Sequence, residues 1–265
     1  MKKHSDNIKN CSINNKNKSI SCFSKLQIIN MLNKLNKKLN KKIKINKSNS
    51  KNKLYTQLLK ELNCNDDYCV SRYNQIFDET NFKLILKPIL QKGKFGPISN
   101  IEINKIMLQF QEKYDDFVYL GTAPLNFKSL FFDEYYNINF KKYQKNKKCL
   151  GMIINTEPLP LSGQHWITLF IDLRNQNPEI NFFDSLGEMP QKEIQDYINH
   201  IKNQLNGEVN ITYNKTRYQK GGNQCGIYGI HFIQKSIEND LNKRVFKKYF
   251  NDNKMQDIRS NYYRI

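Results

Sequence analysis

A cysteine at the start of an apolar segment of helical length is the feature that most constrains this chain. Cys225 follows the flexible loop Gly221-Gly222-Asn223. The residues after it predict a buried helix through their apolar side chains, which belong to Ile227, Tyr228, Ile230, Phe232 and Ile233. At the N-terminus of such a helix, unpaired backbone N–H groups and the positive end of the helix dipole stabilise a thiolate. Cys225 is therefore the candidate nucleophile.

The candidate general base is a histidine that stands directly before an apolar segment. His165 is followed by residues 166–171, Trp-Ile-Thr-Leu-Phe-Ile, which predict a strand covered on both faces. A histidine beside a core strand is often a structural imidazole, but the presence of Cys225 favours the catalytic interpretation. The other three histidines lie in a polar tail or in helical segments: His4, His200 and His231.

Two acidic residues compete for the role of orienting the imidazole, and strand alternation decides between them. Asp172 lies seven residues after His165, so the two side chains point to opposite faces of the strand. Asp184 ends a second predicted strand, and the midpoint between Asp184 and His165 falls near a polar turn at residues 174–179. A hairpin there would bring the two residues side by side, and Asp184 is therefore the predicted orienting group.

An acyl-transfer site also needs hydrogen-bond donors for the developing oxyanion. Gln219, six residues before Cys225, can supply a side-chain amide, and the N–H of Cys225 itself is the second expected donor. Gln224 is a rival for the amide role, but a residue adjacent to the nucleophile points away from it more often than toward it. We therefore expect Gln219 in the oxyanion hole.

These four motifs occur in an order that resembles a known clan of proteases. The order is His165-Trp, then Asp184-Ser-Leu, then Gln219 with a six-residue step to Cys225-Gly-Ile-Tyr. It resembles the ubiquitin-like-protein protease clan, which includes SUMO-deconjugating enzymes, the adenovirus protease and the polyprotein proteases of large DNA viruses. Residues 98–107 and 117–127 make the likeness greatest to the African swine fever virus type of polyprotein protease.

The resemblance implies a fold, a mechanism and a function. The fold would be α+β, a papain-like core with a central mixed sheet flanked by helices and an additional N-terminal helical arm. The matching catalytic positions are occupied by His165, Asp184, Gln219 and Cys225. No metal or organic cofactor is implied. The implied function is that of a viral cysteine endopeptidase that processes capsid and core polyprotein precursors after Gly-Gly.

Glycine specificity in these enzymes comes from a narrow channel that only residues without a Cβ can enter. Many relatives carry a Trp just before the opening helix as one wall of this channel, whereas Gly96-Pro97-Ile98 stands there in this chain. Trp166 is the remaining candidate wall, with a core aromatic as the competing interpretation. The expected substrate-binding residues are Trp166, Gly222 and Gln224, the last at a position where the deconjugating enzymes usually have Asp.

Charge and periodicity divide the chain. Residues 1–60 contain sixteen Lys and one acidic residue, Asp6, so this part carries about +15 of the net charge of +19. Three parts are predicted: a disordered basic tail at 1–20, a helical basic arm at 21–85 with leucines at helical spacing, and the protease core at 86–265. In the core, helices are expected from Ser99 and from Pro190 toward Gly207, and strands at 150–155, 166–172, 180–184 and 209–213.

The basic arm raises the question of a polyanionic partner. Clustered lysines neutralise phosphates, which favours a weak contact with nucleic acid or another polyanion. Against this, Lys, Asn and Ile are enriched together, as in an AT-biased coding sequence, and no Arg precedes Tyr55. No apolar run approaches the roughly 18 residues of a membrane span. Six cysteines without an apolar leader favour an intracellular site, which for such a viral enzyme means the virus factory in the host cytoplasm and the virion.

Two further points stay open. Cys64 and Cys69 could form a metal half-site or a redox pair, but no second Cys or His pair lies nearby in the sequence, so structural thiols are expected. The alternative functions are a deSUMOylase-like or deubiquitinase-like isopeptidase, whose substrates also end in Gly-Gly, and a non-catalytic binding module. An intact set of four catalytic residues argues against the binding module.

Overall fold

The computed structural model of the chain describes residues 10–13, 15, 20–40, 42–77, 82–130, 132–239 and 251–265. The chain divides into two compact units, Met1–Ile89 with Asn261–Arg264, and Leu90–Ser260 with Ile265. Residues 261–264 thus lie in the first unit, although the sequence analysis assigned all of 86–265 to one core. No helix within the described ranges is long and apolar enough to cross a membrane.

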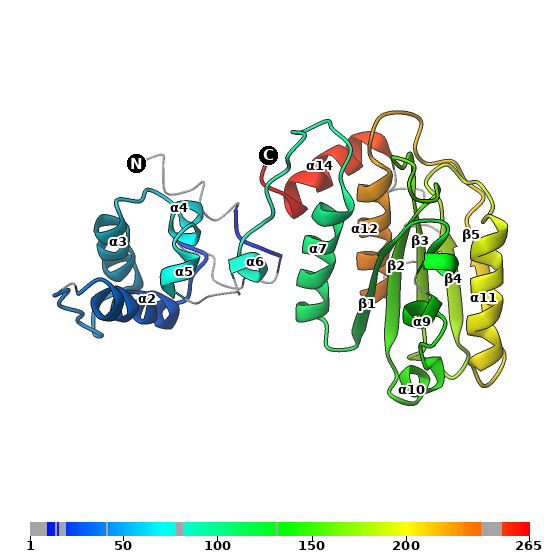
Figure 1. The fold of residues 1–265 in the computed structure, drawn as a ribbon, viewed down its shortest axis with the longest axis horizontal. Helices are drawn as coiled ribbons and strands as arrows, with labels where there is room; N and C mark the ends of the chain where they lie inside the picture. Colours follow the sequence, from blue (N-terminus) through cyan, green and yellow to red (C-terminus); the bar gives the residue numbers. More distant parts are fainter. Residues whose placement is uncertain are drawn as a thin grey trace. The chain divides into compact units, whose positions relative to one another are not determined.

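A five-stranded mixed sheet forms the centre of the second unit (Figure 1). The strands lie in the order β1 Phe117–Ala123, β2 Cys149–Asn155, β3 Trp166–Asp172, β4 Glu179–Phe183 and β5 Asn210–Tyr213. The pairs β2·β3 and β3·β4 are antiparallel, whereas β1·β2 and β4·β5 are parallel. The four predicted strands are confirmed to within one residue at their ends. β1 was not predicted as a strand.

Helices cover both faces of this sheet (Figure 1). Alternate residues of β2 and β3 pack on one face against the side chains of α8, α10 and α11, in one apolar cluster. Helices α7 and α12 contact β1 and β3 respectively. The helices of this unit are α7 Asn100–Lys113, α8 Phe127–Leu130, α9 Phe132–Tyr135, α10 Phe140–Lys145, α11 Lys192–Gln204, α12 Cys225–Ile237 and α14 Asp252–Tyr262, the last two residues of α14 belonging to the first unit.

Small residues allow α12 to lie close to the sheet. A Cβ added at Gly229 of α12 would lie 2.5 Å from Thr168 Oγ1 of β3, and one added at Gly151 of β2 would lie 3.1 Å from Ile233 Cδ1. Contacts this short leave no room for a side chain, so the two glycines fix the depth at which the helix packs. Both faces of β3 are therefore buried, as its continuous apolar sequence predicts.

The predicted helix starts are confirmed at two positions. Ser99 caps α7 through a capping box, in which its side chain accepts the Glu102 N–H and the Glu102 side chain accepts the Ser99 N–H. Cys225 is the first residue of α12, directly after the glycine-containing loop. Helix α11 begins at Lys192, two residues after the predicted Pro190.

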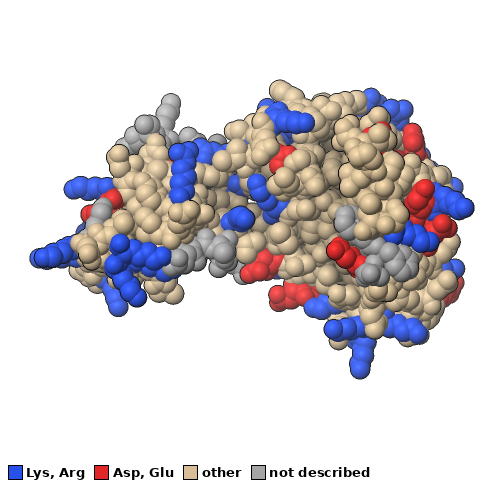
Figure 2. Space-filling model, in the orientation of Figure 1, with Lys and Arg blue, Asp and Glu red and all other residues tan. Residues whose placement is uncertain are grey.

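The first unit is a small helical arm with its own apolar core. Its helices are α2 Lys25–Lys38, α3 Lys51–Leu62, α4 Asp67–Ser71, α5 Asn74–Phe77 and α6 Phe82–Ile85. The predicted leucine periodicity supplies the buried residues, including Leu32, Leu35, Leu54 and Leu58. Leu26 and Leu39 are exceptions, because 66% and 46% of their surfaces are exposed. Figure 2 shows lysine side chains spread over the face of this unit that it draws.

Two expectations for the arm were wrong. Cys64 forms a disulfide with Cys69, so the two residues predicted to be structural thiols are a bonded pair, and Cys11 forms a second disulfide with Cys22. Cys11 is also buried and its neighbour Ser12 donates its N–H to Ile85, so residues 10–13 are not part of a disordered tail. Spacing along the sequence did not reveal these pairs, because packing of the arm brings the Cys11 and Cys22 segments together. Most of the remaining predicted tail lies outside the described residues.

Candidate active site

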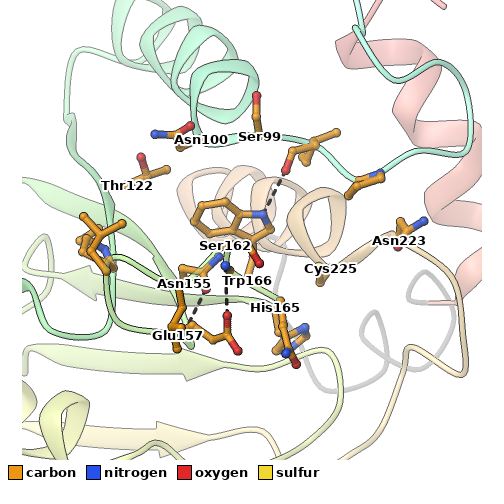
Figure 3. A pocket seen from close by; sticks show the side chains of 18 of the residues that line it. Ser99, Asn100, Thr122, Asn155, Glu157, Ser162, His165, Trp166, Asn223 and Cys225 are labelled. Carbon is orange, nitrogen blue, oxygen red and sulfur yellow. Dashed lines mark hydrogen bonds between the residues drawn. The ribbon is translucent and has the colours of Figure 1, made fainter.

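A cleft of about 500 Å³ opens at the N-terminal end of α12 (Figure 3). Four segments line it: the chain from Lys92 into the start of α7, the end of β1, the connection between β2 and β3, and the loop that leads into α12. Cys225, His165, Trp166, Gln219 and Gly222 are all among its lining residues. The fold thus brings together five of the seven predicted site residues on one surface.

Cys225 lies at the head of α12 with a free thiol and 8% of its surface exposed. The residue before it, Gln224, occupies the N-cap position but makes no side-chain capping hydrogen bond. The first backbone N–H groups of the helix therefore receive no capping side chain from Gln224. This is the setting in which a helix N-terminus favours an anion.

His165 stands one residue before β3 and contacts both Asp184 and Cys225. Its Nε2 lies 2.6 Å from Asp184 Oδ1, and the Cys225 thiol lies close enough to favour the protonated imidazole. Burial disfavours the imidazolium, but the hydrogen bonds to Asp184 and Cys225 outweigh burial and raise the pKa of His165 to about 9. The imidazole is therefore placed to share a proton with the thiol.

Asp184 directly follows β4, at the end of the sheet where β3 begins. The antiparallel register pairs Thr168 with Phe183, so residues just before β3 and just after β4 meet at the same end of the hairpin. Asp184 Oδ1 also accepts the Leu186 N–H at 2.8 Å, which fixes the carboxylate. The rival acid, Asp172, lies at the opposite end of β3 and binds Arg174 instead.

Gln219 is buried, and both ends of its amide are engaged. Its Oε1 accepts a hydrogen bond from Ser185 Oγ at 2.8 Å, and its Nε2 donates to the Gly222 carbonyl at 2.9 Å. Gly222 has φ of +71°, in the left-handed region that glycine adopts without strain. The amide nitrogen carries a second N–H, which the cleft can use.

Trp166 and Ile98 form a contact beside the nucleophile. The Trp166 indole N–H donates to the Ile98 carbonyl at 3.1 Å, and both residues line the cleft together with Pro97 (Figure 3). A Cβ added at Gly226 would lie 2.6 Å from the Ile98 side chain and 3.3 Å from Trp166 Cδ1. The residue after Cys225 must therefore be small.

Gln224 does not line the cleft. Its side chain is buried and its Nε2 donates to Gln256 Oε1 of α14. Its place beside the nucleophile in the sequence did not put its side chain in the cleft, because the first turn of α12 rotates successive residues away from one another.

Residues 134–264, which include Cys225, His165 and Asp184, match the family described as "Ulp1 protease family, C-terminal catalytic domain". The chain contains a cysteine protease domain of the Ulp1 family. A thiol protease of Acanthamoeba polyphaga mimivirus is 27% identical over 172 residues, which cover 63% of this chain and 56% of that protein. The chain therefore spans little more than half the length of that relative.

The likeness to proteins of African swine fever virus extends to the fold. A cysteine protease of that virus is 20% identical over 191 residues, covering 66% of this chain and 70% of that protein. The crystal structure of the African swine fever virus protease matches with a TM-score of 0.70 at 20% identity, covering 97% of this chain and 96% of that chain. The predicted family and the α+β fold with a central mixed sheet flanked by helices are thus confirmed.

Sequence reasoning missed several residues that hold the loops of this Ulp1-type domain. Asp252, the first residue of α14, accepts the N–H groups of Lys220 and Gly221 and the Tyr228 hydroxyl. Arg259, fully buried in the same helix, donates to the carbonyls of Lys94, Gly96 and Asn223. Helix α14 therefore holds together two loops that line the cleft, which also contact each other through the Asn223 side chain and the Phe95 carbonyl. Nothing in the local sequence around α14 signals this role.

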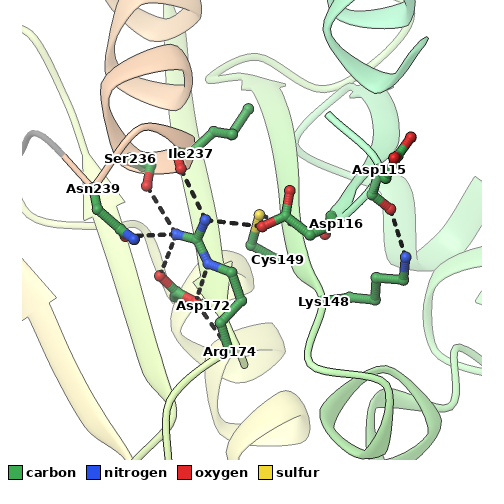
Figure 4. A network of polar contacts seen from close by, with 9 residues as sticks. All are labelled: Asp115, Asp116, Lys148, Cys149, Asp172, Arg174, Ser236, Ile237 and Asn239. Atoms are coloured by element: carbon green, nitrogen blue, oxygen red, sulfur yellow. Dashed lines mark hydrogen bonds and ion pairs between the residues drawn. The ribbon is translucent and has the colours of Figure 1, made fainter. Parts of the chain in front are cut away.

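A second network fixes the far end of α12 in the Ulp1-type domain (Figure 4). The Arg174 guanidinium donates to the carbonyls of Ser236 and Ile237 at the C-terminal end of the helix. Asp172 binds Arg174 through both carboxylate oxygens. Asp116, the residue directly before β1, accepts a further hydrogen bond from Arg174 Nη1. The hydrogen bond to Asp172 raises the pKa of Arg174, so the cation is permanent. The nucleophile helix is thus secured at the end opposite Cys225.

Proposed function

We propose that this protein is a viral cysteine endopeptidase that cleaves capsid or core polyprotein precursors after Gly-Gly. The observation that carries the proposal is the 2.6 Å contact between His165 and Asp184, with His165 and Cys225 lining the same cleft. Three groups in this order supply a nucleophile, a base and the group that orients the base. The viral relatives named as thiol and cysteine proteases support the same reaction class.

In the proposed mechanism, the Cys225 thiol transfers its proton to His165 and the thiolate attacks the scissile carbonyl carbon. The carbonyl π electrons move to oxygen, and the oxyanion is stabilised by the Cys225 N–H and a Gln219 amide N–H. When the intermediate collapses, the C–N bond breaks and His165 gives its proton to the leaving amine. Water, deprotonated by His165, then hydrolyses the thioester and restores the thiol. Asp184 holds the imidazole throughout.

The glycine preference rests on the shape of the cleft next to Cys225. Trp166 and Ile98 crowd the space around Gly226, and Pro97 stands where many relatives have a tryptophan. Extended chain passing such a constriction is accepted most easily when it lacks a Cβ. Gly222 lies on the opposite side, where its backbone faces the same space. The site of action would be where these precursors assemble, in the virus factory of the host cytoplasm and in the virion.

One observation favours a second function. A relative from another African swine fever virus isolate carries the name SUMO-1 cysteine protease and is 20% identical over 191 residues. Ubiquitin-like modifiers also end in Gly-Gly, so the same cleft would serve an isopeptidase. A polyprotein precursor and an isopeptide-linked modifier, offered side by side to the purified protein, distinguish the two. Faster release of the modifier would select the isopeptidase.

The central experiment compares two peptides that differ in one residue. A peptide with Gly-Gly before the cut should be hydrolysed, and Ala in place of the glycine nearest the scissile bond should lower kcat/KM at least about tenfold, or about 1.4 kcal/mol. Equal rates for the two peptides would exclude the glycine channel.

Variants of the proposed catalytic residues are the matched controls for that experiment. Cys225→Ala and His165→Ala should abolish cleavage while circular dichroism still shows the native fold, and Asp184→Ala should have a milder effect. Turnover of Cys225→Ala near that of the wild type would refute the mechanism. Failure of a thiol-reactive peptide probe to label Cys225 would point to a binding module without catalysis.

A further inference from the structure

Two consecutive residues after β4 serve different parts of the site. Asp184 binds His165, and Ser185 binds Gln219. The two residues lie in the turn that follows β4, which the Gly187 N–H closes on the Asp184 carbonyl at 2.9 Å, so one short segment reaches both groups at once. The base and the proposed oxyanion donor are thereby connected through a single peptide bond.

Ser185 holds Gln219 by more than one contact. The carbonyl oxygen of Ser185 accepts the backbone N–H groups of both Tyr218 and Gln219, each at 2.9 Å. The Ser185 hydroxyl donates to Gln219 Oε1 at 2.8 Å, and 1% of Ser185 and 6% of Gln219 are exposed. Solvent therefore has little access to this contact, and a water molecule could not readily take the place of the Ser185 hydroxyl.

The Gly222 carbonyl, which only accepts, selects one of the two orientations of the amide, and the Ser185 hydroxyl fixes the position of its other end. With Oε1 toward Ser185, the amide nitrogen faces the Gly222 carbonyl and donates to it. A flipped amide would place Oε1 against the Gly222 carbonyl, where two acceptors repel each other, and would turn the N–H groups away from the cleft. The Gly222 carbonyl therefore sets the orientation of the amide, and the Ser185 hydroxyl anchors the amide in that orientation.

We propose that Ser185 is a positioning residue for oxyanion stabilisation: its hydroxyl keeps an N–H of Gln219 aimed into the cleft. This inference rests on the proposed function, because it assigns a partner to the oxyanion donor of that reaction. Preorganised donors stabilise a transition state without reorganising during the reaction, and removing a donor outright typically costs about 10²–10³ in kcat. Loss of the Ser185 hydroxyl would loosen the Gln219 amide without removing it, so we expect a smaller loss in kcat.

The test is Ser185→Ala in the full-length chain, assayed with a Gly-Gly peptide. The kcat should fall about tenfold with KM unchanged, because the donor acts on the transition state and not on the bound substrate. The rate at which iodoacetamide alkylates Cys225 should stay at the wild-type value, because alkylation needs the thiolate and His165 but no oxyanion donor. In a Gln219→Ala background, adding Ser185→Ala should cause no further loss.

Matched variants keep this test decisive. Ser236→Ala removes another buried hydroxyl, which donates to Phe232 within α12, and should leave kcat unchanged. Ser185→Cys conserves the size of the side chain with a weaker donor, and should give an intermediate kcat if Ser185→Ala does not fold.

Three results would overturn the inference: a kcat for Ser185→Ala within twofold of the wild type, losses from Ser185→Ala and Gln219→Ala that multiply, or an equal fall in the alkylation rate. A wild-type protein that is alkylated at Cys225 but cleaves no Gly-Gly substrate would instead refute the proposed function. The two failures are therefore distinguishable.

Discussion

Asn214 binds the backbone of Asp184 through both groups of its side-chain amide. The Asp184 N–H donates to Asn214 Oδ1 at 2.7 Å, and Asn214 Nδ2 donates to the Asp184 carbonyl at 2.6 Å. Asn214 directly follows β5, so the edge strand of the sheet fixes the residue that orients His165. Asn214 therefore holds the backbone of Asp184, and the Leu186 N–H holds its carboxylate.

Replacing Asn214 should therefore weaken catalysis without touching any proposed catalytic side chain. Asn214→Ala leaves the Asp184 N–H without its partner and removes one of the two donors to the Asp184 carbonyl, which still accepts the Gly187 N–H. This change should cost about 1–3 kcal/mol of unfolding free energy and lower kcat. Asn214→Asp is the matched variant, because it keeps the acceptor for the Asp184 N–H but loses the donor. We expect its stability and kcat to lie between those of Asn214→Ala and the wild type. Identical kcat values for all three proteins would contradict this role.

The raised pKa of His165 predicts the alkaline limit of activity. Because His165 must carry a proton to give to the leaving amine, kcat/KM should fall as pH rises through about 9. Asp184→Ala removes one of the hydrogen bonds that raise the pKa, so its alkaline limb should move to lower pH. The pH profiles of the two proteins, measured with the same peptide, decide the matter. Coincident alkaline limbs would show that Asp184 does not tune the base.

The same shift has a consequence for stability, with a definite sign. The pKa of His165 is raised in the folded protein from a reference value of 6.5, so the folded state binds the proton more tightly than the unfolded state. Its contribution is fully present below pH 6.5 and is lost as pH rises through about 9. Denaturant unfolding at pH 6 and pH 9.5 should show this loss, and His165→Gln should remove it.

Arg174 should be the most sensitive position at the far end of α12. Arg174→Met leaves Asp172 buried without its cation, with 9% of that side chain exposed, and removes the donors to the last carbonyls of the helix. Breaking a buried pair in this way typically costs about 3–5 kcal/mol. Lys235→Met breaks a more exposed pair with Glu238 on the same helix, and should cost less than about 1 kcal/mol. Urea unfolding of both variants provides the comparison, and equal costs would contradict the buried-pair argument.

The arm can be tested apart from the chemistry. Deleting residues 1 to about 80 leaves Cys225, His165 and Asp184 in place, so turnover of a short Gly-Gly peptide should survive if the core folds alone. A full-length precursor should lose affinity, and more so at low salt, if the Lys-rich surface contributes to binding. Circular dichroism of the truncated protein is the necessary control, because residues 261–264 belong to the first unit and lose their neighbours. A folded core that no longer cuts the short peptide would mean that the arm completes the site.

The sequence predicted the parts of the site that depend on local order. Helical periodicity placed Cys225 at the start of α12, and strand alternation separated Asp184 from Asp172. β1 escaped prediction because Gly121, with φ of +104°, interrupts its register with β2 and its apolar alternation. Asn214, Ser185, Asp252 and Arg259 escaped because each acts across the fold on a backbone group or an amide. Such contacts leave no periodic signal in the neighbouring sequence.

The missing side chain at Gly226 also constrains how this chain can change over generations. A Cβ at that position would lie 2.6 Å from two atoms of Ile98, and Ile98 holds the Trp166 indole through its carbonyl. Mutation at one of these positions therefore alters what is tolerated at the other. A descendant that acquires Ala at position 226 keeps this cleft most easily if Ile98 has first lost both its Cγ1 and its Cδ1, as in Ala. The two positions should change as a pair, and Ile98→Ala should act as a suppressor of Gly226→Ala.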